Sequence, residues 1–574
     1  ANVLRNKMRV YLDIETNLAH NQIWMCVTKK DGEVLVWRDA NNLQQYLDGH
    51  VCVAHNGIGF DYPVLKRIWG VSIPDDMQRD TLVLSRLYNP QLIAPEGSKA
   101  KPHSLEAWGL RLGDYKGGFK DFDAGYSPEM EEYCIQDVYV LEKLDLMLEQ
   151  TMQELKFSET SIVIEHKVAQ ICDQMEENGF ALDIQKAQIL LATLSGEMFD
   201  IEEEMQTVFP PIIEERISDK TGKRLQDKVT VFNPGSRQQI VKRLIGKGVR
   251  LTKKTEKGNF TIDEDVLEGI DLPEAKIFGR YLMIQKRVAA VSSWLDLVGE
   301  DGRMHGRIIT NGAVTGRATH NTPNMGQVPA VGKPYGEECR AMFGVAPGMM
   351  QVGVDLSGIE LRCLGHYLND QAWIDELVKG DIHWFNAQSF GIVEKGTVQD
   401  SKNPEHKTKR GNTKTLTYAV LYGSGAAKAG AIVGGNSAHG KKMINSFTKN
   451  TPGLMELKAK LSKFVKKGHL PGLDGRRVWI RSEHAALNTL LQSAGAIIAK
   501  QWLIECDRDL KAANIPAKLM AWVHDEVQYE TAPEHATALK EIVEAAATKA
   551  GVVLQFRCPV DAEGKIGVNW YETH

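Results

Sequence analysis

Arg410-Gly-Asn-Thr-Lys414-Thr-Leu-Thr-Tyr418-Ala-Val-Leu-Tyr422-Gly423 places an arginine, a lysine and two tyrosines at intervals of four residues. On an α-helix each interval turns about 400°, so these side chains form one stripe, cationic at its first end and aromatic at the other. Such a surface suits a polyphosphate beside a stacked base, without a glycine-rich phosphate loop. An amphipathic helix with buried tyrosines and solvated charges has the same spacing, so the stripe alone leaves both interpretations open.

Chain length and composition indicate a globular protein of several domains. The 574 residues are too many for one hydrophobic core and predict three or four structural units. No apolar run reaches the roughly 18 residues that a bilayer span needs, and no signal peptide opens the chain, which predicts a cytoplasmic protein without a membrane segment. The eight cysteines are scattered without a C-x-x-C pair and are expected to be reduced thiols.

The charge balance limits how this chain could bind nucleic acid. Its net charge of −5 excludes a polycation, so binding would have to use local basic patches. Residues 242–257 carry seven Lys or Arg against one Glu, and residues 402–414 are basic again. The alternative for each patch is a solvated face.

The pattern of elements predicts an α/β region followed by a largely helical one. Strand-like runs at Met8–Glu15 and Glu33–Trp37 alternate with sequence patterns typical of helices over about the first 155 residues. Long helices are expected at Thr160–Asn178 and Ile184–Val208, and Pro210–Val231 is expected to be a looser segment. Apolar runs predict buried strands at residues 350–356 and 519–529. A mostly helical region is expected at residues 374–469.

Four acids near the amino terminus form the first candidate site. Asp13 and Glu15 are two residues apart on a predicted strand, so both carboxylates point to the same face. Asp61 follows a second strand end, while Tyr133 and Asp137 share one face of a predicted helix. Such a set could hold two divalent cations about 4 Å apart, the arrangement used for phosphodiester hydrolysis, with Tyr133 orienting the attacking water.

These four acids and the tyrosine, in this order, resemble the DEDDy 3′→5′ exonucleases. The resemblance implies an RNase H-like 3′→5′ exonuclease domain over residues 1–155, with Asp13, Glu15, Asp61 and Asp137 as metal ligands. Asp80 matches a recurrent element of these domains, and its place before an apolar run predicts a helix cap.

A second set of acids lies in apolar surroundings far along the chain. Gln351-Val-Gly-Val-Asp355-Leu-Ser-Gly-Ile-Glu360 predicts a strand that ends in an acid and turns into a helix. Ala521-Trp-Val-His524-Asp525-Glu526-Val-Gln-Tyr predicts a hairpin with acids at its tip. Buried carboxylates need a partner, usually a divalent cation. Asp355 and Asp525 are 170 residues apart, so spacing does not show whether they meet.

These two segments and the opening stripe resemble motifs A, C and B of the DNA polymerase I family, the family A DNA polymerases. The similarity extends to Asn311-Gly-Ala-Val-Thr-Gly316-Arg317-Ala, Gly380-Asp-Ile-His383 and His484-Ala-Ala-Leu-Asn488-Thr-Leu-Leu-Gln492, and most resembles the replicative polymerases of short-tailed bacteriophages. It implies a right-hand polymerase domain over residues 156–574, of mixed α/β and α+β class. The thumb would lie at about 165–300, the palm at about 301–375 and 475–574, and the fingers at about 376–474.

The resemblance implies a role for several residues of this domain. Asp355 and Asp525 would hold two catalytic Mg²⁺ ions, for which Mn²⁺ could substitute, with Glu526 beside them. Arg410, Lys414 and His383 would clamp the triphosphate of a deoxynucleotide; Tyr418 would stack near its sugar and base, and Tyr422 would lie where the template enters. Glu360 would fill the space of a ribose 2′-hydroxyl. Four residues would contact the primer–template minor groove, whose acceptors vary little with sequence: Arg317, His484, Asn488 and Gln492.

The implied activity is template-directed DNA synthesis with proofreading, in phage genome replication inside a host cell. Its implied ligands are primer–template DNA and deoxynucleotides, with the basic stretch 242–257 gripping phosphates from the thumb. A phage helicase-primase and a single-strand binding protein are candidate partners, and a monomer is expected. The segment between Val208 and Phe232 is short, which speaks against the use of host thioredoxin as a processivity clamp.

Three other functions remain as alternatives. A nuclease with a non-catalytic carboxy-terminal region is disfavoured by Asp355, Asp525, Arg410 and Lys414 together. A single-subunit RNA polymerase is disfavoured by Glu360 and the exonuclease-type acids. An interaction scaffold gives no reason for two sets of acids.

Overall fold

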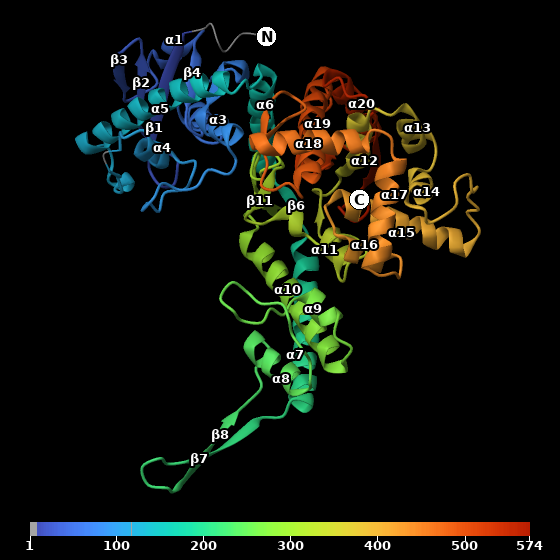
Figure 1. Ribbon diagram of the computed structural model, residues 1–574. Helices are drawn as coiled ribbons and strands as arrows, with labels where there is room; N and C mark the ends of the chain where they lie inside the picture. The colour runs from blue at the N-terminus through green and yellow to red at the C-terminus, as the bar shows by residue number, and fades with distance from the viewer. Residues whose placement is uncertain (1–7, 116) are drawn as a thin grey trace.

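The computed structural model describes residues 8–115 and 117–574, and its elements fall into four regions that are visible in Figure 1. An amino-terminal α/β domain runs from β1 to α5. The helix α6 (Glu159–Asn178) leads from it into the rest of the chain. A helical arm, a four-stranded sheet with its covering helices, and a second helical lobe make up that remainder.

The α/β domain is built on one mixed sheet in the order β3-β2-β1-β4-β5, in which β1 pairs antiparallel to β2 and parallel to β4. One face of the sheet packs against α5, and the other face packs around the short helices α1 and α2. The α/β class predicted for this region is therefore confirmed. Its elements are β1 (Arg9–Thr16), β2 (Ile23–Lys30), β3 (Glu33–Trp37), α1 (Leu43–Leu47), β4 (Val51–Ala54), α2 (Asp61–Val64), β5 (Gln78–Asp80), α3 (Thr81–Tyr88), α4 (Leu105–Arg111) and α5 (Pro128–Glu154).

Helix caps in this domain follow from the sequence. The Asp80 side chain accepts a hydrogen bond from the Leu82 amide at the start of α3, as predicted. The same carboxylate also accepts from the amides of Asn56 and Ile58, 2.9 and 3.1 Å away, and so ties the turn after β4 to the start of α3.

The helical arm extends away from the rest of the molecule and ends in a β-hairpin (Figure 1). Its core is aromatic, with Phe209, Phe232 and Phe278 in contact through ring centroids 5.1 to 5.8 Å apart. Small strands at its base form a three-stranded sheet in which β6 pairs with both β12 and β9. The elements here are β6 (Phe180–Leu182), α7 (Ile184–Val208), β7 (Ile212–Ile217), β8 (Arg224–Thr230), α8 (Arg237–Gly246), α9 (Glu264–Glu268), α10 (Pro273–Leu297), β9 (Arg303–Met304), β10 (Arg307–Ile309), β11 (Thr319–Asn321), α11 (Gly336–Ala341) and β12 (Phe343–Gly344).

The hairpin corrects one expectation, because residues 210–231 are not loose. β7 and β8 pair antiparallel with a bulge between Glu214 and Arg216. Both strands mix charged and apolar residues without regular alternation, and Ile213, Ile217 and Val229 are more than half exposed. The many charged residues hid the strand pattern in the sequence.

The four-stranded sheet holds the largest core of the molecule. Its order is β16-β17-β13-β18, all neighbours antiparallel, and α12, α19, α20 and α6 contribute to the core that it shares. The strands predicted at 350–356 and 519–529 are confirmed as β13 and as the β16–β17 hairpin. The elements are β13 (Met350–Leu356), α12 (Ile359–Leu368), α19 (Ala486–Ala512), β16 (Ala517–Val523), β17 (Glu526–Thr531), α20 (Ala536–Val553) and β18 (Ala562–Gly567).

The second lobe is helical, as expected for residues 374–469. It consists of α13 (Gln371–Lys379), α14 (Ile382–Phe390), α15 (Pro404–Leu421), α16 (Ala426–Ile432), α17 (Ser437–Asn450) and α18 (Leu454–Lys467), followed by the hairpin β14 (His469–Pro471) and β15 (Arg477–Trp479).

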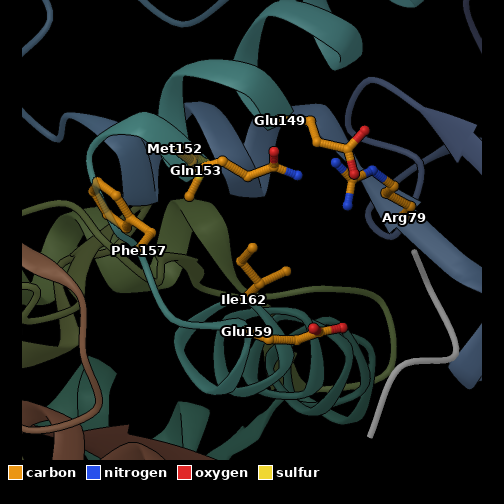
Figure 2. A pocket seen from close by; sticks show the side chains of 7 residues that line it. All are labelled: Arg79, Glu149, Met152, Gln153, Phe157, Glu159 and Ile162. Carbon is orange, nitrogen blue, oxygen red and sulfur yellow. The ribbon is translucent and has the colours of Figure 1, made fainter.

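The helix α6 joins the α/β domain to the large sheet. Its His166 ring nitrogen accepts from the Asp80 amide at 3.0 Å, while its buried Glu165 pairs with Lys500 of α19 and with Arg476, both at 2.6 Å. Figure 2 shows a pocket at this junction, where α5 ends and α6 begins. The pocket is lined by Arg79, Glu149, Met152, Gln153, Phe157, Glu159 and Ile162, none of which belongs to a predicted site.

Two further features concern the cysteines and the helices of the described residues. All eight cysteines are buried free thiols. Across the described residues, no helix combines the length and the apolar character that crossing a bilayer would require.

Candidate active sites

The amino-terminal acids come together on the face of the sheet that α5 covers. Asp13 and Glu15 alternate along β1 with Ile14, which points into the opposite core. Asp137 projects from α5, and Asp61, the first residue of α2, accepts a hydrogen bond from the Ile14 amide at 3.2 Å. Ligand atoms of Asp13, Glu15 and Cys134 lie within 4.8 Å of one another, so a cation could contact all three.

The electrostatics of this cluster disfavour four ionised carboxylates. Burial, reinforced by neighbouring acids, raises the pKa of Glu15 to about 10, of Asp137 to about 8 and of Asp61 to about 7, and it also raises the pKa of Asp13. Among the ion pairs of the described residues, none involves these four acids. The cluster is an oxygen-rich acidic site without a protein counter-charge, a donor set that fits hard divalent cations.

Tyr133 lies beside these acids as the sequence predicted. Burial and then the charge of Asp137 raise the pKa of its phenol, and the Tyr133 hydroxyl is hydrogen-bonded to Asp137. Its ring lies 6.1 Å from that of Phe119 and 6.5 Å from that of Phe122. The phenol therefore stays protonated at neutral pH and can donate a hydrogen bond next to the cluster.

The second set of acids, which spacing alone could not connect, meets at the ends of neighbouring strands. Asp355 on β13 is directly opposite Glu526 on β17. Asp525 occupies the turn between β16 and β17, and its carbonyl accepts from the Leu356 amide at 2.9 Å. The hairpin predicted around Asp525 is confirmed. It brings all three acids to the same end of the neighbouring strands β13 and β17.

This second cluster has mixed electrostatics. Burial and the charges of Glu526 and Asp525 raise the pKa of Asp355 to about 7, and burial also raises the pKa of Asp525. Burial works against ionised Glu526 as well, yet hydrogen bonds from His574 and Trp570 and the charge of Arg340 lower its pKa overall. Glu526 is thus the acid held ionised by the protein itself.

Sequence reasoning missed the residues that surround Glu526. Its carboxylate accepts hydrogen bonds from Trp570 and Gln528, both at 2.6 Å, and lies 3.2 Å from the His574 ring and 3.8 Å from Arg340. The Arg340 guanidinium also stacks 4.1 Å from the Trp570 ring centroid. Only the alternation of polar and apolar residues in β17 hinted that Gln528 shares a face with Glu526; nothing in the sequence pointed to the others.

The cationic and aromatic stripe is confirmed as one face of α15. Asn403 caps the helix, and Tyr422 is its carboxy-terminal cap residue. The rings of Tyr418 and Tyr422 stack with centroids 6.4 Å apart, and Tyr418 is half-buried. Burial and the charge of Glu360 raise the pKa of Tyr418, which places that acid near the aromatic end.

The cationic end of the stripe faces α14. Arg410 forms an ion pair with Asp381, the residue that caps α14 two positions before His383. Lys414 is exposed. His383 is buried, and its Nδ1 atom has no hydrogen-bond partner among the described residues. Burial followed by the charge of Arg410 lowers its pKa. The three predicted phosphate-binding residues are therefore neighbours. Asp381 lies in the quoted segment Gly380–His383, but the sequence did not indicate that it would pair with Arg410.

Glu360 connects the aromatic end of the stripe to the second cluster. In the first turn of α12, its carboxylate is bonded to Arg317 at 3.1 Å and to the Tyr422 hydroxyl. The charge of Arg317 also favours ionised Asp525. Glu360, Arg317 and Tyr422 thus form one hydrogen-bonded group between α12 and α15.

The remaining predicted residues lie at the start of α19. His484 is exposed just before the helix, and Asn488 and Gln492 follow it at four-residue intervals, both half-buried. The His484 carbonyl packs against Gly423, where a Cβ atom would approach it to 2.9 Å. Gly423 also has a φ of +78°, so this close contact at the end of α15 requires glycine.

Comparison with known proteins places this arrangement in a family. A family model described as DNA polymerase family A matches residues 211–572. The DNA-directed DNA polymerase of Enterobacteria phage T3 is 32% identical, over 95% of this chain and 96% of its own length. That of Escherichia phage T7 is 32% identical over 92% and 93%, and DNA polymerase I of Aquifex aeolicus is 26% identical over 99% and 96%.

A solved structure has the same fold along the whole chain. The polymerase domain of Pol1 from M. smegmatis, determined in complex with DNA primer-template and dNTP, superimposes with a TM-score of 0.80 and 20% identity. The match covers 100% of this chain and 97% of that one. With the family model matching well over half of its residues and a relative at 32% identity along nearly its full length, the chain belongs to the family A DNA-directed DNA polymerases.

Proposed function

We propose that this family A polymerase extends a DNA primer at one acid cluster and removes mispaired ends in the 3′→5′ direction at the other. The observation that carries the proposal is the presence of two separate sets of acids, each gathered beside its own sheet. In this assignment residues 1–155 are the exonuclease domain and residues 156–574 the polymerase domain, with thumb, palm and fingers as the sequence implies. The place of action would be the cytoplasm of an infected host.

Both donor sets fit a pair of magnesium ions. Asp355 and Asp525 would hold two at the polymerase site, and Asp13, Glu15, Asp61 and Asp137 would hold two at the exonuclease site. The ions supply charge neutralisation and a lowered pKa for the attacking hydroxyl or water. The raised pKa values of Asp355 and of the exonuclease acids are what an oxygen site built for cations would have in their absence.

The polymerase residues then bind and orient the incoming deoxynucleotide. Arg410, Lys414 and His383 would contact its phosphates, which requires Arg410 to exchange some of its contact with Asp381 for the triphosphate. Tyr418 would stack beside the sugar, and Glu360 would close the space of a 2′-hydroxyl. Tyr422 would meet the template, and the α19 residues Asn488 and Gln492, with His484 and Arg317, would contact the minor groove of the primer–template.

Separate inactivation of the two clusters tests this assignment. Replacing Asp13 and Glu15 together by Ala should reduce degradation of a labelled primer by at least about 10³-fold and leave extension unchanged. Asp525→Ala should do the reverse. Gel-based extension and degradation assays measure both, with circular dichroism as a folding control. A single substitution that abolished both activities in a folded protein would show that two independent sites do not exist.

Tyr418 makes the nucleotide assignment testable. We propose that its hydroxyl substitutes for the 3′-hydroxyl contact that a dideoxynucleotide lacks, so the enzyme should incorporate chain terminators readily. Tyr418→Phe should raise discrimination against them by about tenfold or more, the worth of one hydrogen bond. Steady-state incorporation of paired deoxy and dideoxy substrates measures the ratio. An unchanged ratio would remove Tyr418 from the sugar site.

We propose that host thioredoxin is not a processivity partner of this chain, because the segment between α7 and α8 holds only the short β7–β8 hairpin. Adding thioredoxin should leave the product length per binding event unchanged. A large gain in product length would refute this. Helicase-primase and single-strand binding protein remain candidate partners of the proposed replication role.

A further inference from the structure

The surface of α17 and α18 carries an unusual concentration of positive charge. Residues 437–467 contain eight lysines and one acidic residue, Glu456, in a chain whose net charge is −5. Neither basic stretch noted in the sequence, 242–257 or 402–414, overlaps this segment. Such an imbalance on an acidic protein points to an anionic ligand.

On α18 the charges gather on one side. Leu454, Leu457 and Leu461 form its buried face. Lys460, Lys463 and Lys467 follow one another at helical spacing on the opposite face, with Lys466 beside them, and all four are exposed. These four residues are called the α18 lysine face. The helix spans about 20 Å, enough for several successive phosphates.

Most of this face is not neutralised by the protein. Lys460 pairs with Glu456 at 2.9 Å, but within the described part of the chain Lys463, Lys466 and Lys467 make no ion pair. By contrast, Lys511, Lys540 and Lys549 on α19 and α20 each pair with a carboxylate. The α18 lysine face therefore retains positive charge that an external polyanion could neutralise.

Contacts connect the middle of α18 to the aromatic end of the α15 stripe. The Ser462 hydroxyl lies 3.4 Å from the Glu483 carboxylate. Glu483 precedes His484, whose carbonyl packs on Gly423, the residue after Tyr422. The exposed Arg481 lies on the same short connection. The lysine face thus begins close to the point where the template strand is proposed to enter.

The carboxy-terminal end of α18 leads to the α/β domain. Gly468, the cap residue of α18, accepts a hydrogen bond from the Ile480 amide at 3.1 Å. Next to Ile480, the Trp479 indole donates to the carbonyl of Tyr88 in α3 at 3.2 Å. The face therefore spans the surface between Tyr422 and the amino-terminal domain, which α18 approaches in Figure 1.

We propose that the α18 lysine face, together with Arg481, binds the phosphates of the unpaired template strand ahead of the primer end. The inference rests on the proposed polymerase function and adds to it a site for single-stranded DNA. Lysines suit this task because they are flexible point charges that contact any phosphate regardless of base. An acidic protein segment is a less suitable occupant, because stable protein interfaces centre on buried apolar or aromatic anchors. Among the described residues of α18, Met455 is the one large hydrophobic residue that is strongly exposed.

The test compares two primer–templates that share the same duplex. One is blunt at the template end and the other carries a 15-nucleotide 5′ overhang. Fluorescence anisotropy in EDTA, where neither acid cluster can act, gives the dissociation constant of each at several salt concentrations. The triple variant Lys463→Gln, Lys466→Gln, Lys467→Gln is compared with wild type and with the charge-matched control Lys511→Gln, Lys540→Gln, Lys549→Gln. Circular dichroism and melting temperature check the folding of both.

The expected result is specific to the overhang. Wild type and control should bind the overhang substrate more tightly than the blunt one. In the α18 variant, the ratio of these two affinities should be about tenfold smaller. Its slope of log affinity against log salt should fall by about 2 on the overhang substrate, since each single-strand phosphate contact contributes about 0.7. Binding to the blunt substrate should not change.

Three outcomes would overturn the inference while leaving the proposed function intact. The α18 variant could keep the full overhang gain, or it could lose affinity equally for both substrates, which would mean duplex contact. It could also keep the overhang gain but lose binding to labelled poly-glutamate, which would identify the face as a dock for an acidic protein segment. Failure of wild type to bind either primer–template would overturn the proposed function as well.

Discussion

The two acid clusters differ in how the charge of their buried carboxylates is balanced. At the amino-terminal cluster, Asp13, Glu15, Asp61 and Asp137 are packed against one another, and the pKa of Glu15 rises to about 10. At the second cluster, Glu526 is surrounded by Arg340, Trp570, Gln528 and His574, and its pKa is lowered. One cluster leaves its charge to be balanced by cations, whereas the other is partly balanced by protein groups.

Burial of acids does not by itself predict their ionisation. Desolvation is the largest influence on both Glu15 and Glu526, yet the net pKa shifts have opposite signs. The difference comes from the neighbours, which are acids in one case and hydrogen-bond donors with a guanidinium in the other. Three experiments test this difference between the clusters.

The largest effect is expected from removing the guanidinium of the second cluster. Arg340→Gln should lower primer extension by about 10- to 100-fold, because a charged partner of Glu526 is worth about 1.5–3 kcal/mol. Degradation at the amino-terminal cluster should be unchanged. Arg508→Gln, on the exposed side of α19, is the matched control. Equal loss of both activities in a folded variant would mean that Arg340 supports the whole molecule and not one cluster.

A smaller effect, of opposite sign at the two sites, is expected for local stability without metal. Glu15→Gln should raise the free energy of opening measured by hydrogen exchange of β1 amides by about 1 kcal/mol. At pH 8 the folded state keeps Glu15 protonated, whereas the unfolded chain releases that proton, and Gln removes this cost. Glu526→Gln should speed exchange in β17 by about 1–3 kcal/mol, since it leaves Arg340 buried without its partner. Mass spectrometry of exchange at pH 8 in EDTA measures both. Shifts of the same sign would contradict the contrast between the clusters.

The most gradual effect is a pH dependence of stability in metal-free buffer. In the folded α/β domain the pKa values of Asp61 and Asp137 are raised to about 7 and 8, above those of the unfolded chain. The folded state therefore retains protons that the unfolded state releases. Stability should be greatest below about pH 4 and fall as pH rises through 8, by up to about 1.4 kcal/mol per pH unit for each retained proton.

Calorimetry from pH 5 to pH 8.5 measures this fall as a lower unfolding temperature of the protein. Magnesium should reduce the fall, because bound cations favour the ionised acids. The double variant Asp61→Asn, Asp137→Asn is the control and should show a shallower dependence. A profile that is flat without metal, or equally steep in the double variant, would contradict the raised pKa values.

Much of the fold and of both sites could be predicted from local sequence. The acids of β1 alternate with core residues, the stripe of α15 has helical spacing, and the hairpin around Asp525 is apolar on both sides of its charges. Each of these signals lies within a dozen residues. The resemblance to family A polymerases then supplied what spacing could not, namely that Asp355 and Asp525 belong to one site.

The rest depends on contacts between distant segments. Arg340, Trp570 and His574 reach Glu526 from places that no motif marks, and the pairing of Tyr422 with Glu360 spans 62 residues. The β7–β8 hairpin was missed for another reason. Its strands are exposed on both faces, so they lack the alternation between apolar and polar residues by which a half-buried strand is recognised.

The helix α6 has a consequence for how the enzyme fails on heating. Its His166 is bonded to the α/β domain, its Glu165 lies in the buried ion pairs with Lys500 and Arg476, and its Asn178 donates to the carbonyl of Leu519 in β16. Unfolding of either neighbour would expose one flank of this helix and strip the other domain of part of its core. The proposed synthesis and degradation, although assigned to separate acid clusters, should therefore disappear within one cooperative melting transition.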